Sequence, residues 1–146
     1  MALFLVRHGR PVVVPGTPPA NWVLDLEHQR DVAELAARAP WPDDAMWFTS
    51  PEPKAARTAS LLAGQSVDVV DDLREHDRGV GGWVDDFHAA MAEAFAQPGS
   101  AVRDGWETLS ETRRRVERWR ARSMPDVIVV EIDRWDRSVR APALAG

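Results

Sequence analysis

Three adjacent residues near the N-terminus, Arg7, His8 and Gly9, have the types and the spacing to act on an anion. They follow an apolar run that begins at Leu3. A buried strand favours such a run, and a glycine allows the backbone to turn where the strand ends. We therefore expect Arg7 and His8 at the carboxyl end of an early strand, where open α/β sheets bind their ligands. A guanidinium beside an imidazole in such a crevice suits an anionic substrate, phosphate above all.

The composition is that of a soluble globular protein and excludes several kinds of site. The chain has 146 residues, 45% of them hydrophobic and 28% charged, and this length favours one domain over residues 1–146. It has no cysteine, so we expect no disulfide, thiolate metal site or cysteine nucleophile. No apolar run approaches the length of a membrane span and no secretory signal is evident, so we expect a cytoplasmic protein that binds no membrane. The formal charge of −5 argues against a general affinity for nucleic acid.

The elements that must position these residues alternate along the chain. Apolar runs predict strands, and apolar residues at helical spacing predict helices between them. This alternation is typical of an α/β fold with a mainly parallel sheet covered by helices. The predicted strands are 3–6, 45–49, 67–70 and 127–132. The first predicted helix begins at Asp25 or Glu27 and ends before Pro40, and the second runs from a cap at Ser50 to Gly64. Two further helices are predicted over 84–95 and 109–122.

Four passages of the sequence resemble motifs of one protein family. They are Val6–Gly9, the Ser-Pro turn and helix of Thr49–Ala59, the acid-bearing Leu73–Glu75, and, more loosely, Gly105–Glu107 with the arginine-rich helix after it. Together they are similar to the histidine phosphatase superfamily, the phosphoglycerate-mutase-like proteins, over residues 3 to about 122. The resemblance implies a three-layer αβα fold with a mainly parallel central sheet.

The resemblance also implies roles for individual residues. In the family, the histidine of Arg-His-Gly is the nucleophile and its neighbouring arginine binds the phosphoryl oxygens, which assigns these roles to His8 and Arg7. Glu75 matches the acid that protonates the leaving oxygen. Side-chain cations stabilise the transferring phosphoryl group, so no metal or organic cofactor is expected. Two plainer interpretations stay open: His8 as a structural residue at a strand end, and Glu75 as an exposed loop carboxylate.

Two departures from the family pattern bear on activity. The second motif has Lys54 where the family has arginine, which keeps the charge but loses the planar fork that grips two phosphoryl oxygens. Arg57 lies about one helical turn further on and would compensate if its face meets the pocket, although a solvated helix arginine is the commoner case. We assign Arg7, Lys54 and Arg57 as the candidate substrate-binding residues.

The second departure is at the C-terminal end. The family's last core strand normally ends in a second His-Gly, whereas here the strand runs into Glu131 and Asp133, and no histidine follows His88. An acidic residue at that strand end would repel phosphate. We therefore expect a truncated or altered C-terminal end from about Glu131 onward, for instance through a frameshift in the coding DNA.

These observations leave three functions open. The first is hydrolysis of a phosphomonoester, a phosphorylated small molecule, through a phosphohistidine on His8, impaired by the loss of the second histidine. The second is a catalytically weak or inactive relative that binds a phosphorylated ligand, phosphate or a partner protein. The third is a structural domain, in which apolar surface left by a missing C-terminal element would be covered in a homodimer.

Overall fold

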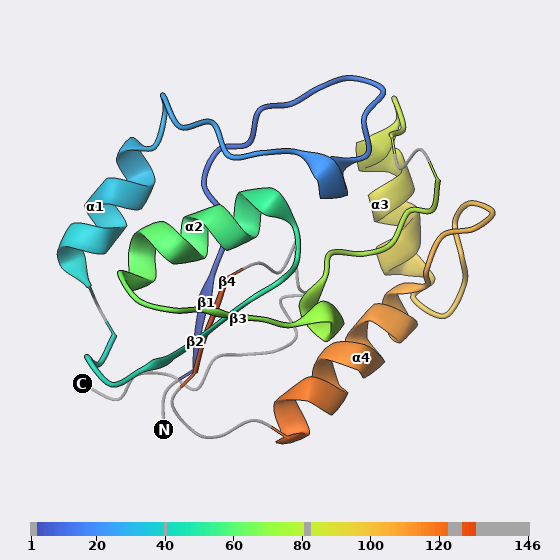
Figure 1. Cartoon of the computed structure of the whole chain (residues 1–146). Helices are drawn as coiled ribbons and strands as arrows, with labels where there is room; N and C mark the ends of the chain where they lie inside the picture. The colour runs from blue at the N-terminus through green and yellow to red at the C-terminus, as the bar shows by residue number, and fades with distance from the viewer. Residues whose placement is uncertain (1–2, 40, 81–82, 123–126, 131–146) are drawn as a thin grey trace.

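The computed structural model describes residues 3–39, 41–80, 83–122 and 127–130. Helices and strands alternate as far as β3, and α3 and α4 then follow each other before β4, as Figure 1 shows. In chain order the elements are β1 (Leu3–Val6), the 3-10 helix η1 (Pro19–Asn21), α1 (Arg30–Arg38), β2 (Met46–Thr49), α2 (Pro53–Ala63), β3 (Asp68–Val69), the 3-10 helix η2 (Asp71–Leu73), α3 (Phe87–Ala96), α4 (Leu109–Arg122) and β4 (Val127–Val130).

The described strands form one parallel sheet in the order β1-β4-β2-β3. The register places Val6 of β1 beside Val130 of β4, and Val130 beside Thr49 of β2. Because the strands are parallel, the residues that follow β1 and β2 leave the sheet at the same edge. This confirms the predicted parallel sheet and brings the first two sequence motifs to one edge of it.

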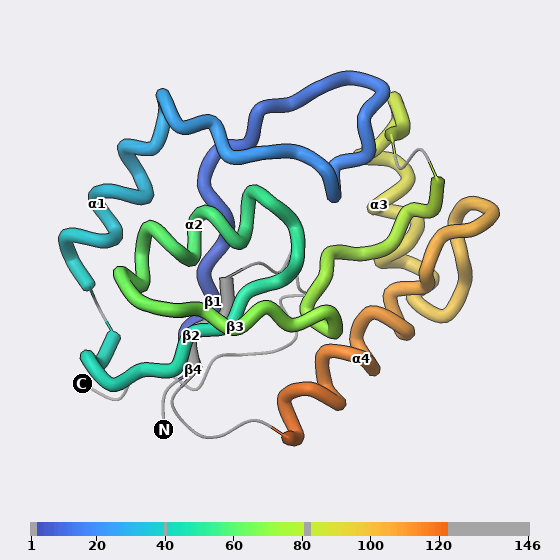
Figure 2. Tube along the Cα trace, viewed as in Figure 1, coloured from blue at the N-terminus to red at the C-terminus, as the bar shows by residue number. Residues whose placement is uncertain are grey.

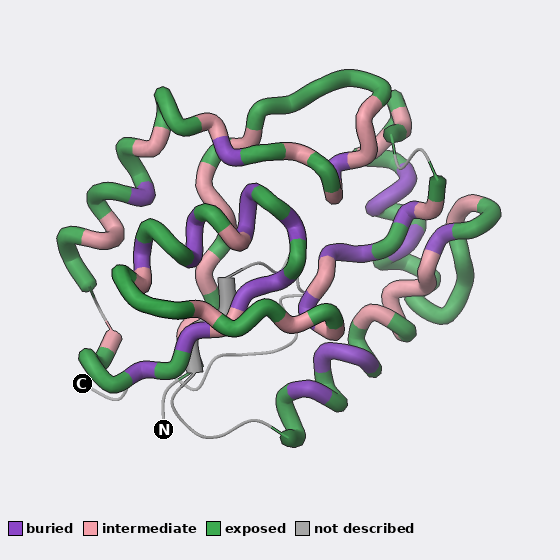
Figure 3. The backbone as a smooth tube through the Cα atoms, in the orientation of Figure 1, coloured by how far each residue is buried: buried purple, intermediate pink, exposed green. Residues whose placement is uncertain are grey.

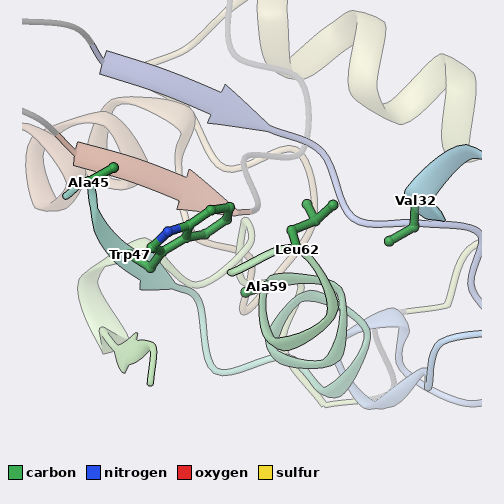
Figure 4. Packing of buried hydrophobic residues seen from close by; sticks show 5 residues of the cluster. All are labelled: Val32, Ala45, Trp47, Ala59 and Leu62. Carbon is green, nitrogen blue, oxygen red and sulfur yellow. The ribbon is translucent and has the colours of Figure 1, made fainter. Parts of the chain in front are cut away.

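One face of the sheet packs against α1 and α2. The buried cluster on this face contains Trp47 of β2, Val32 of α1, and Ala59 and Leu62 of α2, with Ala45 at the start of β2. Figure 4 shows these five side chains between the sheet and the two helices. Small residues on α2 allow the helix to approach the sheet closely, because Ala55 and Ala59 are fully buried.

The opposite face packs against α4. Residues alternate between the two faces of a strand, so Phe48 points away from Trp47 and lies against Trp119, with ring centroids 5.3 Å apart. Val116 and the buried Leu73 complete this second cluster. Figure 3 shows buried residues recurring along both α2 and α4, the helices that sandwich the sheet. The three-layer αβα fold predicted from the sequence is confirmed.

Three helices begin later than the sequence predicts, and one of them, α3, begins at Phe87 rather than at residue 84. Asp25 does not open α1, because its carboxylate accepts a hydrogen bond from the Glu27 backbone N–H and its carbonyl accepts one from His28, which forms a separate turn. Ser50 does not cap α2 either. The helix begins at Pro53, whose fixed φ suits a first helical position, and Ser50 is fully buried before it. At the other end of α2, Gly64 adopts the left-handed conformation and ends the helix as predicted.

Strand β1 is less buried than its sequence predicts. Leu3 is 43% exposed and Leu5 is 52% exposed, although both belong to the apolar run. The reason is the position of β1 at an edge of the described sheet, where it pairs with β4 alone. On this face of the sheet, α4 packs against β2. The expected continuous burial of this strand is therefore wrong, while its position and end are correct.

The chain between β1 and α1 makes a long excursion above the sheet. Figure 2 shows it running out from the end of β1 and returning to α1. The outgoing and returning arms are joined by hydrogen bonds, from Val12 N to Val23 O at 2.9 Å and from Asp25 N to Arg10 O at 2.9 Å. The 3-10 helix η1 lies at the far end of this excursion, which brings Pro19 over the N-terminal turn of α2.

The predictions for the C-terminal end are only partly covered. The strand predicted over 127–132 corresponds to β4, and the altered segment from Glu131 onward lies outside the described residues. Across the ranges that are described, no helix combines the length and the apolar character needed to cross a bilayer.

Candidate active site

The end of β1 presents the first sequence motif to an open cavity. Arg7 is exposed and His8 is half-buried immediately after the strand. The His8 Nδ1 lies 2.6 Å from the Gly9 carbonyl oxygen. Since a carbonyl oxygen only accepts hydrogen bonds, Nδ1 carries the proton, and in the neutral ring the lone pair is on Nε2. This is the tautomer that a nucleophilic histidine would need.

The cavity beside His8 has a volume of about 410 Å³. It lies between the end of β1 and the facing sides of α1 and α2. Arg7 and Arg10 contribute positive charge to its wall, and Asp31 of α1 contributes one negative charge. Its lining residues are Arg7, His8, Gly9, Arg10, Pro11, Asp31, Val32, Leu35, Thr58 and Leu62.

A pair of hydrogen bonds fixes the turn after His8 onto α2. The Gly9 backbone N–H donates to Thr58 Oγ1 at 3.0 Å, and the Thr58 hydroxyl donates to the Lys54 carbonyl at 2.8 Å. Thr58 is only 1% exposed, so both bonds are shielded from water. Gly9 is needed for this approach, because a Cβ there would contact the Gln29 side chain and Val32. The second motif of the sequence therefore positions the first.

Lys54 and Glu75 form a buried ion pair. The Lys54 Nζ lies 2.7 Å from Glu75 Oε2, and the two side chains are 3% and 5% exposed. The ammonium also donates to the Pro19 carbonyl at 2.9 Å and lies 5.7 Å from the centroid of the Trp22 ring. The other carboxylate oxygen of Glu75 accepts a hydrogen bond from Arg78 at 3.0 Å. Glu75 is thus held between two cations rather than exposed on a loop.

The backbone of Glu75 is anchored to the start of α2. Its N–H donates to Glu52 Oε1 at 3.0 Å, and Glu52 occupies the N-cap position of the helix. Glu52 is 4% exposed, and its second oxygen has no hydrogen-bond partner among the described residues. The acid-bearing loop and the N-terminal turn of α2 are therefore joined twice, through Glu52 and through Lys54.

The structure brings the predicted site residues together in two groups. Arg7 and His8 border the cavity, and Lys54 and Glu75 pair beneath the excursion, outside the lining of that cavity. Arg57 is exposed on α2 and does not line the cavity. The assigned roles of all five residues remain predictions.

Sequence reasoning missed the residues that support Glu75. Glu52 is part of the second motif but was not assigned a role, and Arg78 follows Glu75 by three residues in a polar loop. The signal for Arg78 was weak, because a loop sequence does not show which of its charges are buried. Arg115 of α4 lies next to the buried Val116 and one helical turn before the buried Trp119, so helical spacing indicates that it faces inward.

The arrangement suits phosphoryl transfer. A neutral imidazole with its lone pair on Nε2 is a nucleophile for phosphorus, and cations beside it stabilise the charge on the equatorial oxygens. A carboxyl group held in a closed environment is a candidate proton donor for the leaving oxygen. The described residues supply each of these groups at one edge of the sheet, joined through α2.

Comparison with solved structures supports this interpretation of the fold. TTHB049 from Thermus thermophilus superposes with a TM-score of 0.68 and 26% identity, over 87% of this chain and 75% of that chain. The mycobacterial glucosyl-3-phosphoglycerate phosphatase matches with a TM-score of 0.71 and 16% identity, over 88% of this chain and 71% of that one. The alpha-ribazole phosphatase of Shigella flexneri matches with a TM-score of 0.59 and 20% identity, over 88% and 72%. No family model and no curated protein matches the sequence.

Proposed function

We propose that this chain, whose fold matches solved phosphatases, is a member of the histidine phosphatase superfamily and hydrolyses phosphomonoesters through a phosphohistidine on His8. The observation that carries the proposal is the His8 ring beside Arg7 at the strand end, bordering an open cavity with its Nδ1 on the Gly9 carbonyl. The solved phosphatases with this fold support a phosphatase activity in general. The substrate class is a phosphorylated small molecule, and the proposed location is the cytoplasm.

The reaction has two displacements at phosphorus. His8 Nε2 attacks, the P–O bond to the alcohol breaks, and Glu75 gives a proton to the leaving oxygen. Water then attacks the phosphohistidine, the P–N bond breaks, and the Glu75 carboxylate accepts a proton from the water. Arg7 binds the phosphoryl oxygens. For Lys54 to bind the phosphoryl group as well, its ammonium must leave the ion pair with Glu75, because neither side chain lines the cavity beside His8.

The test is release of phosphate from 4-nitrophenyl phosphate by the wild-type chain and by His8→Ala. We expect the substitution to abolish His8-dependent turnover. The matched control is His88→Ala, because His88 is exposed on α3 and does not line the cavity. Equal rates for wild type and His8→Ala would overturn the proposal.

A second function is favoured by one observation. Lys54, at the position of the family's phosphate-binding arginine, is closed into an ion pair with Glu75. A chain with this arrangement would bind a phosphorylated ligand or a partner protein without turning it over. The distinguishing result is a rise in melting temperature with phosphate or vanadate, together with phosphate release no faster than that of His8→Ala.

A further inference from the structure

Arg115 of α4 is buried, and every nitrogen of its guanidinium is hydrogen-bonded. The side chain is 3% exposed. Three of its bonds end on backbone carbonyls of the segment that leads into the candidate acid, and two end on one carboxylate. The acceptors are Asp72 O at 2.8 Å and Arg74 O at 2.7 Å for Nη1, Glu75 O at 2.9 Å and Glu107 Oε2 at 2.8 Å for Nη2, and Glu107 Oε1 at 2.8 Å for Nε.

Glu107 extends this contact along the loop beyond Glu75. Its carboxylate accepts a hydrogen bond from the Asp77 backbone N–H at 3.2 Å, and its own N–H donates to the Asp77 carbonyl at 2.8 Å. The Glu107 carbonyl also accepts a hydrogen bond from the Nε2 of the buried His76. Burial acts to raise the pKa of Glu107, but the hydrogen bonds from Arg115, Asp77 and Thr112 outweigh it and lower this pKa to about 2. Glu107 is therefore ionised at neutral pH.

The result is a loop whose backbone is fixed on both sides of Glu75. The Glu75 N–H donates to Glu52 at the start of α2, and the Glu75 carbonyl accepts a hydrogen bond from Arg115 of α4. Apolar packing adds a third anchor, because Leu73 lies against Val116 in the core. The side chain of Glu75 points toward Lys54 only if this stretch of backbone keeps its place.

We propose that Arg115, together with Glu107, is a positioning residue that sets the place of Glu75 for proton transfer to the leaving group. Arg115 binds the backbone carbonyls of Asp72, Arg74 and Glu75 and contacts neither the phosphoryl group nor the alcohol. The inference rests on the proposed phosphatase function. Lysine at this position keeps the positive charge but has no planar fork to span the three carbonyls and the carboxylate.

The experiment compares two kinds of substrate in the same variants. 4-Nitrophenyl phosphate has a leaving group that needs little protonation, whereas a simple alkyl phosphate depends on a general acid, whose contribution is about 10²–10⁴-fold. For Arg115→Lys we expect kcat to fall roughly tenfold or more with the alkyl phosphate and about threefold or less with the aryl phosphate, with KM little changed in both. The matched control is Arg120→Lys, an exposed arginine of the same helix, which should change neither rate.

A second measurement separates positioning from general damage to the fold. In a Glu75→Gln background, Arg115→Lys should add little to the loss of alkyl phosphate turnover, because both substitutions act on one proton transfer. If Arg115→Lys does not fold, Glu107→Gln replaces it, with the same expected dependence on the leaving group. Equal losses on both substrates, or losses that multiply in the double variant, would overturn the positioning role.

The outcomes also distinguish this inference from the proposed function. Turnover that requires His8 but shows a uniform loss in Arg115→Lys removes the positioning role and leaves the phosphatase. Phosphate release that does not depend on His8, or no release by the wild-type chain, overturns the phosphatase and the positioning role together.

Discussion

Replacing Glu107 with glutamine should destabilise the protein at neutral pH and much less in acid. The Glu107 side chain is 11% exposed and receives two hydrogen bonds from Arg115, so the substitution removes the only carboxylate that Arg115 contacts among the described residues. The pKa of Glu107 is lowered from 4.5 to about 2 in the folded protein. Each pKa unit corresponds to about 1.4 kcal/mol, so the ionised carboxylate contributes about 3 kcal/mol at pH 7.

The sign of the pH dependence follows from the direction of that shift. A carboxyl whose pKa is lower in the folded state stabilises the protein fully above its ordinary pKa and loses this contribution as the pH falls toward the folded value. For Glu107 the contribution is complete above pH 4.5 and lost through pH 2, and at pH 3 about 1 kcal/mol of it remains.

Urea unfolding at pH 7 and at pH 3 measures this difference directly. We expect Glu107→Gln to lower the free energy of unfolding by about 3 kcal/mol at pH 7 and by about 1 kcal/mol at pH 3. The control is Glu117→Gln, which removes an exposed i,i+4 pair with Arg113 within α4 and should lower it by about 0.5 kcal/mol or less. A loss for Glu107→Gln that is the same at both pH values, or no larger than that of the control, would refute the reasoning.

Two further substitutions test the packing around the site. Lys54→Met breaks a buried ion pair and leaves a carboxylate without one of its cations, so urea unfolding should show a loss of about 3–5 kcal/mol, against about 0.5 kcal/mol or less for the exposed Arg57→Met. Gly9→Ala places a methyl group 2.7 Å from Val32 Cγ2 and should lower stability by about 1–3 kcal/mol, whereas Gly99→Ala, with open space around it, should show no such loss in the same assay.

Local patterns were sufficient to predict most of the elements. The helix over Leu109–Arg122 has the predicted bounds, because its apolar positions recur at helical spacing and a loop precedes it. Gly64 ends α2 because glycine adopts the left-handed conformation easily. The start of α1 was not predictable in this way. Asp25 has the residue type of a helix cap. Which backbone N–H donates a hydrogen bond to its carboxylate depends on the turn that the chain makes there.

The position of Arg7 and His8 at the strand end was predictable, whereas the contacts of Glu75 were not. Arg7 and His8 follow an apolar run, and the residue at which such a run ends can be read from the sequence alone. The pairing of Lys54 with Glu75 joins two segments brought together by the parallel sheet, and no spacing rule relates their positions. Arg115 belongs to a helix rich in arginines. Its burial depends on hydrogen-bond acceptors from other parts of the chain, the Glu107 carboxylate and the Glu75 carbonyl.

The position of Lys54 and Thr58 on α2 ties the two halves of the candidate site to one rigid element. Their side chains are one helical turn apart, so a fixed helix sets the distance between the groups they contact. Thr58 holds the turn after His8, and Lys54 holds the carboxylate of Glu75. A change that shifts the first turns of α2 therefore moves His8 and Glu75 together. Ala55 and Ala59 are fully buried, and the packing of Ala59 with Trp47 of β2 helps to keep those turns in place.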